Sequence, residues 1–493
     1  MLSGSVLGKL YRWWEDARIF ALLSAFADVF GRAWRSSAAR RVLLCGTSRW
    51  YKSSFAARVP DACFSFVLRK IQPAAINSAV IRACAKTALL RLDVLFGGFV
   101  CLMFCVPHPL WHNQLALAAA AAFFVLVLVL AAAGKRRAAM PSEFGPAALL
   151  FVLALLASLL FSLDVKDSVR VLGFFAAAFL LMWSSASALC SRRALWAFLC
   201  WIYAAVLITS VYAAAQRFLG VAVNAAQIDM LLNPGVPGRV YSTLDNPNNF
   251  AEFLVLLTPL CAVLALNAKK VLHRFLLALG LVLPLAALLM TYSRSGWLSA
   301  ALTVLIFVYF TDRRLVPWIF ALGILALPFL PAPVLVRLSN LFNTSDTSAD
   351  YRLRIWQTTA RLLGDQHRWI TGIGLGPSTL AKQIEFFADD YVLAGIVHSQ
   401  MLYTELLLET GLLGFVSFIW MMGSSVLQAA GSIWKARDPL ARGILSACVA
   451  SFAGMALFGV FEYIWFYPRV LFAFFLMIGV MKAAAGLAGE DAA

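Results

Sequence analysis

The chain has 493 residues, of which 62% are hydrophobic and only 13% are charged, and its formal net charge is +17. A soluble domain of this length would contain about 25% charged residues, so the composition excludes an ordinary soluble protein. The basic excess does not indicate nucleic-acid binding, because most Lys and Arg residues cluster beside the ends of apolar runs, as the positive-inside rule predicts. We therefore expect an all-α polytopic membrane protein, whose spans are helices because only helices and closed barrels satisfy the backbone in lipid.

Residues 1–86 form a basic N-terminal extension ahead of the spans. Its apolar segment, Ile19–Phe30, is short and follows Glu15 and Asp16, and no small-residue cleavage site comes after it, so a signal peptide is not expected. We expect interfacial amphipathic helices on the cytoplasmic face, where basic residues meet anionic lipid head groups. A poorly ordered tail is the alternative.

Apolar runs predict about twelve transmembrane helices between residues 87 and 486, with a large outer loop at about 331–398 between the ninth and tenth. The expected spans are 88–107, 114–133, 146–163, 170–190, 194–214, 249–267, 274–292, 295–311, 315–335, 399–424, 443–461 and 467–486.

The connections between spans predict the orientation, because those on alternate sides are consistently basic. The basic connections are Lys135–Arg137, Arg192–Arg193, Lys269–Lys270, Arg313–Arg314 and the segment holding Lys435, Arg437 and Arg442. With these inside, both termini are cytoplasmic and the protein is a multi-pass protein of the cell inner (cytoplasmic) membrane. The nine cysteines are scattered without the His or carboxylate spacing of a metal site, so no metal is expected.

Three arginines stand on the expected outer side at the membrane edge: Arg217, Arg239 and Arg294. An arginine there is costly unless it reaches the interface, pairs or faces a wet cavity, and its planar fork suits phosphate oxygens. We expect them to bind a lipid-linked pyrophosphate, although each could instead reach outer head groups or pair with a loop carboxylate. The nearby Asn-Pro-Asn-Asn run adds amide side chains, and we expect Asn246 and Asn249 to contact substrate.

The outer loop contains an amphipathic segment, Asp350–Leu363, whose apolar residues recur at helical spacing. We expect a helix on the outer surface that roofs a cavity. Arg352 and Arg354 are candidates for substrate contact, with solvated or head-group-facing charge as the alternative. The following TGIGLGPS lacks the Lys-Ser/Thr of a phosphate loop and predicts only a glycine-rich turn.

His398 ends the loop immediately before the tenth span, which places its ring at the mouth of the helix bundle. A neutral imidazole there could accept a proton from an acceptor hydroxyl or orient it. Glu405 and Glu409 follow on the next helix, and we expect these carboxylates to pair with buried polar groups rather than to act in catalysis.

Four segments in this order resemble the O-antigen ligase/polymerase family of membrane proteins, including its bicarbonate-transporter-like branch. They are RVYSTLDNPNNFAEFL, TYSRSGWL, RLRIWQTTARLL with ITGIGLGP, and HSQMLYTELLLETGLLGF. The resemblance covers about residues 90–485 and implies a glycosyltransferase C-like bundle of twelve spans with the large outer loop. It further implies an undecaprenyl-pyrophosphate-linked glycan donor and no metal or nucleotide cofactor.

Carried over by motif, the resemblance makes Arg239 and Arg294 the pyrophosphate clamp and His398 the residue that activates the acceptor, with Arg217 a weaker candidate. His398 stands thirteen residues before Gly411, a longer interval than is usual in the family, which would favour position 400. If a helix began at His398, this shift of two residues would rotate the side chain by about 200°. If 398–400 is loop, the role is unaffected.

The expected activity is therefore inverting, metal-independent transfer of a lipid-linked glycan to an acceptor hydroxyl on the outer face of the membrane. The acceptor could be a lipid-A core, another glycan repeat unit or a protein serine. A small-anion, bicarbonate-like transporter is the alternative, and a membrane scaffold is a third possibility. A transporter should have polar interruptions near mid-membrane in matching halves, whereas here they gather on one face, which favours interfacial chemistry.

Overall fold

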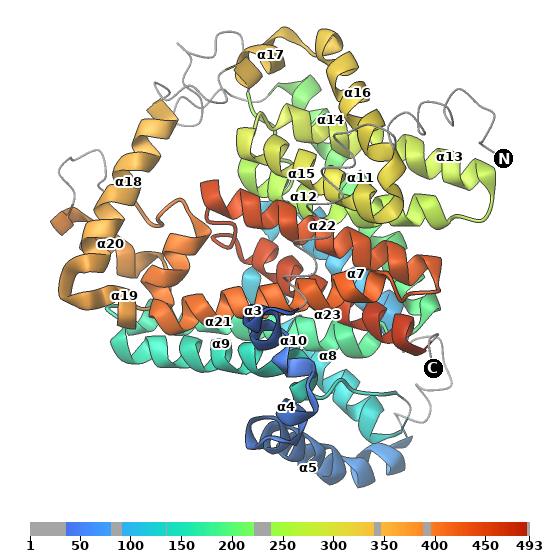
Figure 1. Ribbon diagram of the computed structural model, residues 1–493, viewed down its shortest axis with the longest axis vertical. Helices are drawn as coiled ribbons and strands as arrows, with labels where there is room; N and C mark the ends of the chain where they lie inside the picture. Colours follow the sequence, from blue (N-terminus) through green and yellow to red (C-terminus); the bar gives the residue numbers. More distant parts are fainter. Residues whose placement is uncertain are drawn as a thin grey trace.

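The computed structural model describes residues 36–79, 91–134, 136–220, 238–339, 347–387 and 396–490. Within these ranges the chain forms helices joined by turns and loops, with no strand among them. Ten helices are long and apolar enough to cross a membrane. The expectation of an all-α polytopic membrane protein is thereby confirmed (Figure 1).

The helices of the bundle follow one another through short connections. They are α7 Leu92–Cys105, α8 Asn113–Ala132, α9 Gly145–Ser158, α10 Val165–Ala188, α11 Arg192–Leu219, α12 Pro247–Asn267, α13 Val271–Gly280, α14 Val282–Met290, α15 Arg294–Asp312, α16 Val316–Ala326, α17 Ala332–Ser339, α21 Leu402–Ile433, α22 Pro439–Phe461 and α23 Pro468–Glu490. Before them lie α3 Ala38–Leu43, α4 Arg49–Ser53 and α5 Phe55–Asn77, and the outer loop holds α18 Thr347–Gly364, α19 Arg368–Thr371 and α20 Pro377–Phe387.

The expected spans correspond to these helices one by one. Nine of them match nine of the ten helices of spanning length, and the first matches the shorter apolar helix α7. The expected eighth span and most of the expected ninth fall within the remaining apolar run, Arg294–Phe329, while the ninth was expected to end later, within α17. That run is broken at Asp312, whose extended backbone (φ −156°, ψ 99°) separates α15 from the short turn that leads into α16.

The centre of the bundle is formed by α12, α22 and α23, whose apolar windows are 83%, 72% and 78% buried within the protein. Around them α10 packs on α23, α15 on α22, α7 on α11, and α9 on α21. By contrast the α13–α14 segment is only 17% buried, although it is equally apolar. An apolar helix that leaves most of its surface uncovered is suited to face lipid.

The described part of the N-terminal extension packs against the bundle. α5 lies along α8, and Asp61 accepts hydrogen bonds from the backbone N–H of Ser142 at 2.9 Å and from its hydroxyl at 2.6 Å. The Trp420 indole of α21 donates to the carbonyl of Leu43 at the end of α3. The apolar segment Ile19–Phe30 lies outside the described residues, and the boundary of the extension at residue 86 stays a prediction.

The outer loop is a small helical unit at one end of the bundle (Figure 1). The helix expected at Asp350–Leu363 is confirmed as α18, which packs against α19, α20 and the start of α21. The unit has a core of its own. Its fully buried members are Ile355, Leu362, Ile373, Leu380, Ile384 and Leu408. The loop is therefore folded on itself as well as against the bundle.

Candidate functional site

The site begins in the loop that leads into α12, where the backbone is tied to three neighbouring helices. The Gln216 amide oxygen accepts from the N–H of Ser242 at 2.8 Å, and the Ser242 hydroxyl donates to the carbonyl of Thr209 at 2.6 Å. Thr243 donates to the carbonyl of Phe104 on α7, and Val240 pairs with the end of α14. Because each tie uses a buried polar group, the loop has a defined position.

Arg239 projects from this loop and is almost fully buried, with 8% of its surface exposed. Its Nε donates to the carbonyl of Thr291 at 2.7 Å, and one terminal nitrogen donates to the amide oxygen of Asn248 at 2.6 Å. The fork of the guanidinium is thereby fixed in two directions, as is needed for a group that recognises an oxyanion by geometry as well as charge.

The tight turn between α14 and α15 holds a second arginine in the same way. Tyr292 has a positive φ of 51°, which is unusual for a bulky residue. While the Thr291 carbonyl accepts from Arg239, the Tyr292 carbonyl accepts from Nε of Arg337 at 3.4 Å. Arg337 comes from α17 and is 5% exposed. Two buried arginines from distant parts of the chain are thus anchored on adjacent carbonyls of one turn.

A single carboxylate, Glu462, faces this group from the end of α22. Its Oε2 accepts from the Asn248 amide at 2.7 Å and lies 3.7 Å from a terminal nitrogen of Arg352 on α18. Arg239, Asn248 and Glu462 therefore form one chain of contacts that ends on Arg352 of the outer loop. The outer-loop unit is in this way placed over the buried arginines by an ionic contact.

Positive charge exceeds negative charge in this cluster. Burial, and then the charges of Arg337, Arg352 and Arg294, lower the pKa of Arg239 to about 9, while Glu462 opposes them. Four guanidinium groups from four elements thus interact, and Glu462 is the carboxylate among the described residues whose charge acts on Arg239. Such an excess of buried or partly buried like charge is costly unless an anion offsets it. The arrangement suits a ligand with at least two negative charges.

His398 lies at the edge of the arginine cluster. Its ring centroid is 4.6 Å from that of Phe466 and 6.0 Å from that of Tyr463, and its Nδ1 accepts from the N–H of Gln400 at 3.3 Å. Burial, and then the charge of Arg352, lower the pKa of His398 to about 4. The imidazole is therefore neutral at physiological pH and can accept a proton.

The start of α21 shows whether the two-residue difference in the interval from His398 to Gly411 rotates the His398 side chain. This helix begins at Leu402, and residues 398–400 are loop, with Gln400 in the left-handed region at φ 58°. The side chain of His398 is consequently not rotated by a helical phase, and a role for this residue does not depend on the interval to Gly411.

The glycine-rich segment at residues 371–378, which was expected to form a turn, connects the outer loop to two helices through hydrogen bonds, and we call it the strap. The N–H of Gly376 donates to Oε1 of Glu409 on α21, and the N–H of Ser378 donates to Asp167 on α10. The other carboxylate oxygen of Glu409 accepts from the Tyr463 hydroxyl at 3.1 Å. Glu405 similarly accepts from the N–H of Ser399. The expectation that both glutamates bond buried polar groups is confirmed.

Glycine is required where the strap crosses α21. Gly372 has φ 75°, and a Cβ at this position would lie 2.8 Å from the carbonyl oxygen of Glu409. Opposite it, Gly411 interrupts the helical geometry of α21 with φ 65°, and a Cβ there would collide with the carbonyl oxygen of Ile370. The strap and the helix can approach this closely only because neither residue has a side chain.

The remaining expected residues lie in different settings. Arg217 is exposed at the end of α11, close enough to Tyr292 for its charge to act on that phenol. Asn246 caps α12 by accepting from the N–H of Asn248. Asn249 is 5% exposed, and its Nδ2 has no hydrogen-bond partner in the described part of the chain. Arg354 is paired with Asp350 one helical turn away, in an exposed ion pair of α18.

Sequence reasoning therefore placed Arg239, Arg294, Arg352 and His398 around one region, but it did not single out three residues that complete it. Arg337 stands at the start of the expected outer loop, two residues after the expected ninth span, and was not considered. Glu462 lies in an aromatic connection, and Asn248 lies between two asparagines that were considered. An arginine and a glutamate inside otherwise apolar outer segments were the available signals.

Comparison with known families gives a match to the model described as O-antigen ligase over residues 279–419. No curated protein matches the chain significantly. The matched segment contains Arg294, Arg337, Arg352 and His398, while Arg239 lies before it and Glu462 after it. It supports O-antigen ligase-type function and a glycosyltransferase-like enzyme in general. The expected family resemblance is confirmed over this segment: residues 279–419 of the multi-pass membrane protein match the O-antigen ligase family model.

Proposed function

We propose that the protein transfers a glycan from an undecaprenyl-pyrophosphate-linked donor to an acceptor hydroxyl, with inversion, on the outer face of the cytoplasmic membrane. The observation that carries the proposal is the convergence of four arginines beside a neutral histidine under the outer-loop unit. A pyrophosphate is an anion of the multiplicity that this excess of positive charge accommodates, and its oxygens match the fork of arginine.

In this mechanism the acceptor oxygen attacks the anomeric carbon of the donor sugar as the bond from that carbon to the pyrophosphate oxygen breaks. The leaving undecaprenyl pyrophosphate takes the bonding electron pair, and its growing charge is stabilised by Arg239, Arg294, Arg337 and Arg352. Because these groups are oriented in advance by carbonyls and by Glu462, they need little reorganisation during the reaction. The glycan then joins the acceptor oxygen on the opposite face of the sugar.

His398 receives or orients the proton of the acceptor hydroxyl. Alone, an imidazole with a pKa of about 4 is a weak base. One cause of that low pKa is the charge of Arg352, and a bound pyrophosphate would offset this charge. Donor binding would consequently raise the basicity of His398 toward the value that is useful near neutral pH. Proton acceptance would thus be coupled to the presence of donor.

The alternative of a small-anion transporter would use the same arginines to line a pathway. The described cluster is instead built from the starts of α12 and α15, the end of α22 and the outer loop, which all lie at one end of the bundle. This one-sided placement favours chemistry at an interface. The proposed acceptor hydroxyl belongs to a lipid-A core, a glycan or a protein, and the proposed orientation has both termini in the cytoplasm.

The decisive experiment compares two arginines of the same outer-loop helix. Purified protein is supplied with an undecaprenyl-pyrophosphate-linked glycan and candidate acceptors, and Arg352→Ala is compared with Arg361→Ala, which alters an exposed arginine of α18. We expect Arg352→Ala to reduce transfer by about 100-fold and Arg361→Ala to retain it. Absence of product with every acceptor, together with protein-dependent anion flux in liposomes, would establish the transporter instead.

A further inference from the structure

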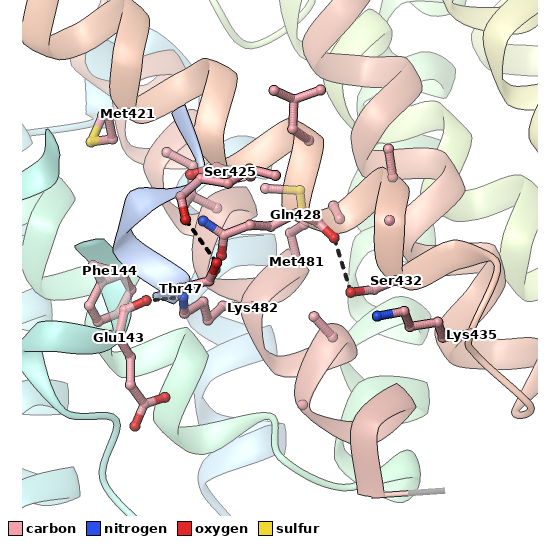
Figure 2. Close-up of a pocket in the computed structure, with 18 of the residues that line it drawn as sticks. Thr47, Glu143, Phe144, Met421, Ser425, Gln428, Ser432, Lys435, Met481 and Lys482 are labelled. Carbon is pink, nitrogen blue, oxygen red and sulfur yellow. Dashed lines mark hydrogen bonds between the residues drawn. The ribbon is translucent and has the colours of Figure 1, made fainter. Parts of the chain in front are cut away.

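A second charged region lies at the other end of the bundle. α15 and α21 both start beside the arginine cluster, and α21 continues past the break at Gly411 to Ile433. The far ends of these two helices, with α23 and the start of α9, surround a pocket of 1320 Å³. Figure 2 shows Glu143, Ser425, Gln428 and Lys482 around it. It exceeds the volume of about 300–1,000 Å³ that is usual for small-molecule sites.

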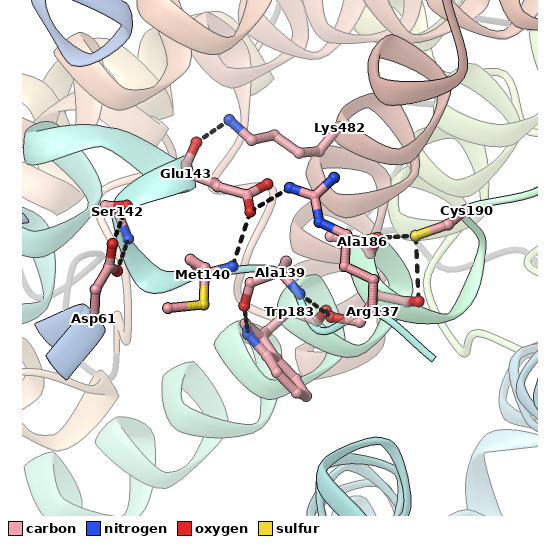
Figure 3. A network of polar contacts seen from close by, with 11 residues as sticks. Asp61, Arg137, Ala139, Met140, Ser142, Glu143, Trp183, Ala186, Cys190 and Lys482 are labelled. Atoms are coloured by element: carbon pink, nitrogen blue, oxygen red, sulfur yellow. Dashed lines mark hydrogen bonds and ion pairs between the residues drawn. The ribbon is translucent and has the colours of Figure 1, made fainter. Parts of the chain in front are cut away.

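The charged lining of this pocket is strongly unbalanced. Among the described residues that line it, the cations are Arg40, Arg137, Lys435 and Lys482, and the carboxylate is Glu143. Arg137 contacts that carboxylate at 2.8 Å, while Lys482 donates to the backbone carbonyl of Glu143 instead (Figure 3). The Glu143 carboxylate is therefore paired with one cation, Arg137. The described lining residues keep a formal excess of three positive charges, which favours an anionic occupant.

The rest of the lining is apolar or aromatic. Phe144, Met182, Met421 and Met481 line the pocket, and Lys482 lies over the Phe144 ring, 5.7 Å from its centroid. Methionine side chains adapt to flexible apolar ligands. A free inorganic anion would make no use of this surface, whereas an amphiphile would use both the charged and the apolar parts.

The rim has the composition of a membrane interface. Trp434 and Tyr309 line the pocket and remain 66% and 49% exposed. Exposed Trp and Tyr at helix ends, next to Lys and Arg, are typical of the level of lipid head groups. The pocket thus combines interfacial aromatics, an excess of cations and an apolar interior. These are the features of sites between transmembrane helices that bind anionic head groups.

We propose that this pocket binds an anionic glycerophospholipid, with its phosphate among Arg40, Arg137, Lys435 and Lys482 and its acyl chains against Phe144 and the methionines. Part of the pocket lining comes from the N-terminal extension, and another part comes from the segment that this extension contacts. Arg40, Leu44 and Thr47 come from the first described helices, and Glu143 is next to Ser142, which binds Asp61 of α5. A bound lipid would therefore join the extension to α21 and α23.

The test uses the full chain in detergent, titrated separately with cardiolipin, with phosphatidylcholine and with inorganic phosphate, and followed by thermal unfolding and by native mass spectrometry for retained lipid. The pocket variant is Arg40→Gln with Lys435→Gln. The matched control is Lys269→Gln with Lys270→Gln, two lysines at the same end of the bundle, between α12 and α13 and outside the lining.

We expect cardiolipin to stabilise the wild type and the control equally and to bind the pocket variant about 10-fold or more weakly, since two of the cations near its head group are removed. Phosphatidylcholine should not stabilise any form. Equal weakening in the control, or no cardiolipin effect on the wild type, would overturn the proposal. Stabilisation by inorganic phosphate that is lost only in the pocket variant would show a free-anion site and would also overturn it. An unfolding temperature without lipid that matches the wild type checks that both variants are folded.

Discussion

The two ends of the helix bundle both gather positive charge, but they do so in different ways. At the outer-loop end the cations are arginines, buried or partly buried, and their forks are fixed by carbonyls of one turn and by Glu462. At the other end, lysines and arginines stand at helix ends around a wide pocket, and Lys435 is exposed. The first arrangement suits geometric recognition of a reacting group, and the second suits attraction of a head group.

The difference teaches that net charge alone does not identify chemistry. Both regions have a formal excess of about three positive charges on the residues named above. At the arginine cluster the guanidinium groups are held in direction by neighbouring carbonyls, and preorganised donors of this kind stabilise a transition state. In the far pocket Arg137 and Lys482 contact Glu143, whereas Lys435 is an exposed point charge that contributes mainly long-range attraction. The predictions below are ordered from the largest expected effect to the smallest and each tests this distinction.

The largest effect is expected for Arg239→Lys. An ammonium can keep the charge, but it cannot bond the Thr291 carbonyl and the Asn248 amide with the fixed fork of a guanidinium. We expect glycan transfer to fall by about 100- to 1,000-fold, measured as product formed by purified protein. Arg361→Lys, at an exposed position of α18, is the matched control. Full activity in Arg239→Lys would mean that charge without geometry is sufficient.

His398→Gln should reduce transfer by about 100-fold and change its pH dependence. In the free protein the pKa of His398 is about 4, below the usual 6.5, so the active neutral form persists as pH falls to about 5 and is lost below about 4. The expected kcat/KM of the wild type is thus constant from neutral pH down to about 5, and the acidic decline caused by this group is missing in His398→Gln. An unchanged acidic decline in the variant would assign that decline to another residue.

The same lowered pKa has a consequence for stability, and its sign follows from proton binding. Between about pH 4 and 6.5 the unfolded chain binds a proton at His398 that the folded chain does not. The contribution of this residue to stability therefore decreases as pH falls through that window and is complete above it. Thermal unfolding of His398→Gln should accordingly depend less on pH between 4 and 6.5 than unfolding of the wild type.

Gly372→Ala tests the strap that holds the outer loop over the arginines. The added methyl would collide with the Glu409 carbonyl, and φ 75° is unfavourable for alanine. We expect a loss of about 1–3 kcal/mol in the free energy of unfolding, together with reduced transfer because Arg352 would be displaced. Gly364→Ala is the control, since a Cβ at that position would meet nothing within 4 Å. Equal destabilisation by both changes would contradict the role of the crossing.

The smallest effect is expected for Lys435→Arg in the far pocket. A point charge at the exposed end of α21 can be replaced by another cation without loss of head-group attraction. The dissociation constant for cardiolipin, obtained from thermal unfolding, should stay within about 2-fold of the wild type. A large change in this dissociation constant would show that lipid binding in the pocket also depends on the geometry of the cation. The contrast between the two ends of the bundle would then fail.

The sequence by itself determined the membrane class, the order of the helices and most of the arginine site. Helix positions were readable because a span needs about 20 apolar residues, and Arg239 and Arg294 were readable because charge is rare and costly at the membrane edge. Arg352 was only a candidate on the amphipathic segment of the outer loop, with solvated charge as the alternative. Hydrophobic spacing was also sufficient to locate α18, since its buried residues recur on one face.

Only the tertiary structure decided which charges meet. Arg337 and Glu462 are 125 residues apart in the chain, and they join one cluster because a single turn offers carbonyls to two arginines while α22 ends at the carboxylate. It likewise separated Arg352, which faces Glu462, from Arg354, which pairs with Asp350 in solvent. Residue type and local spacing give the cost of burying a charge, but the partner that offsets this cost comes from long-range packing.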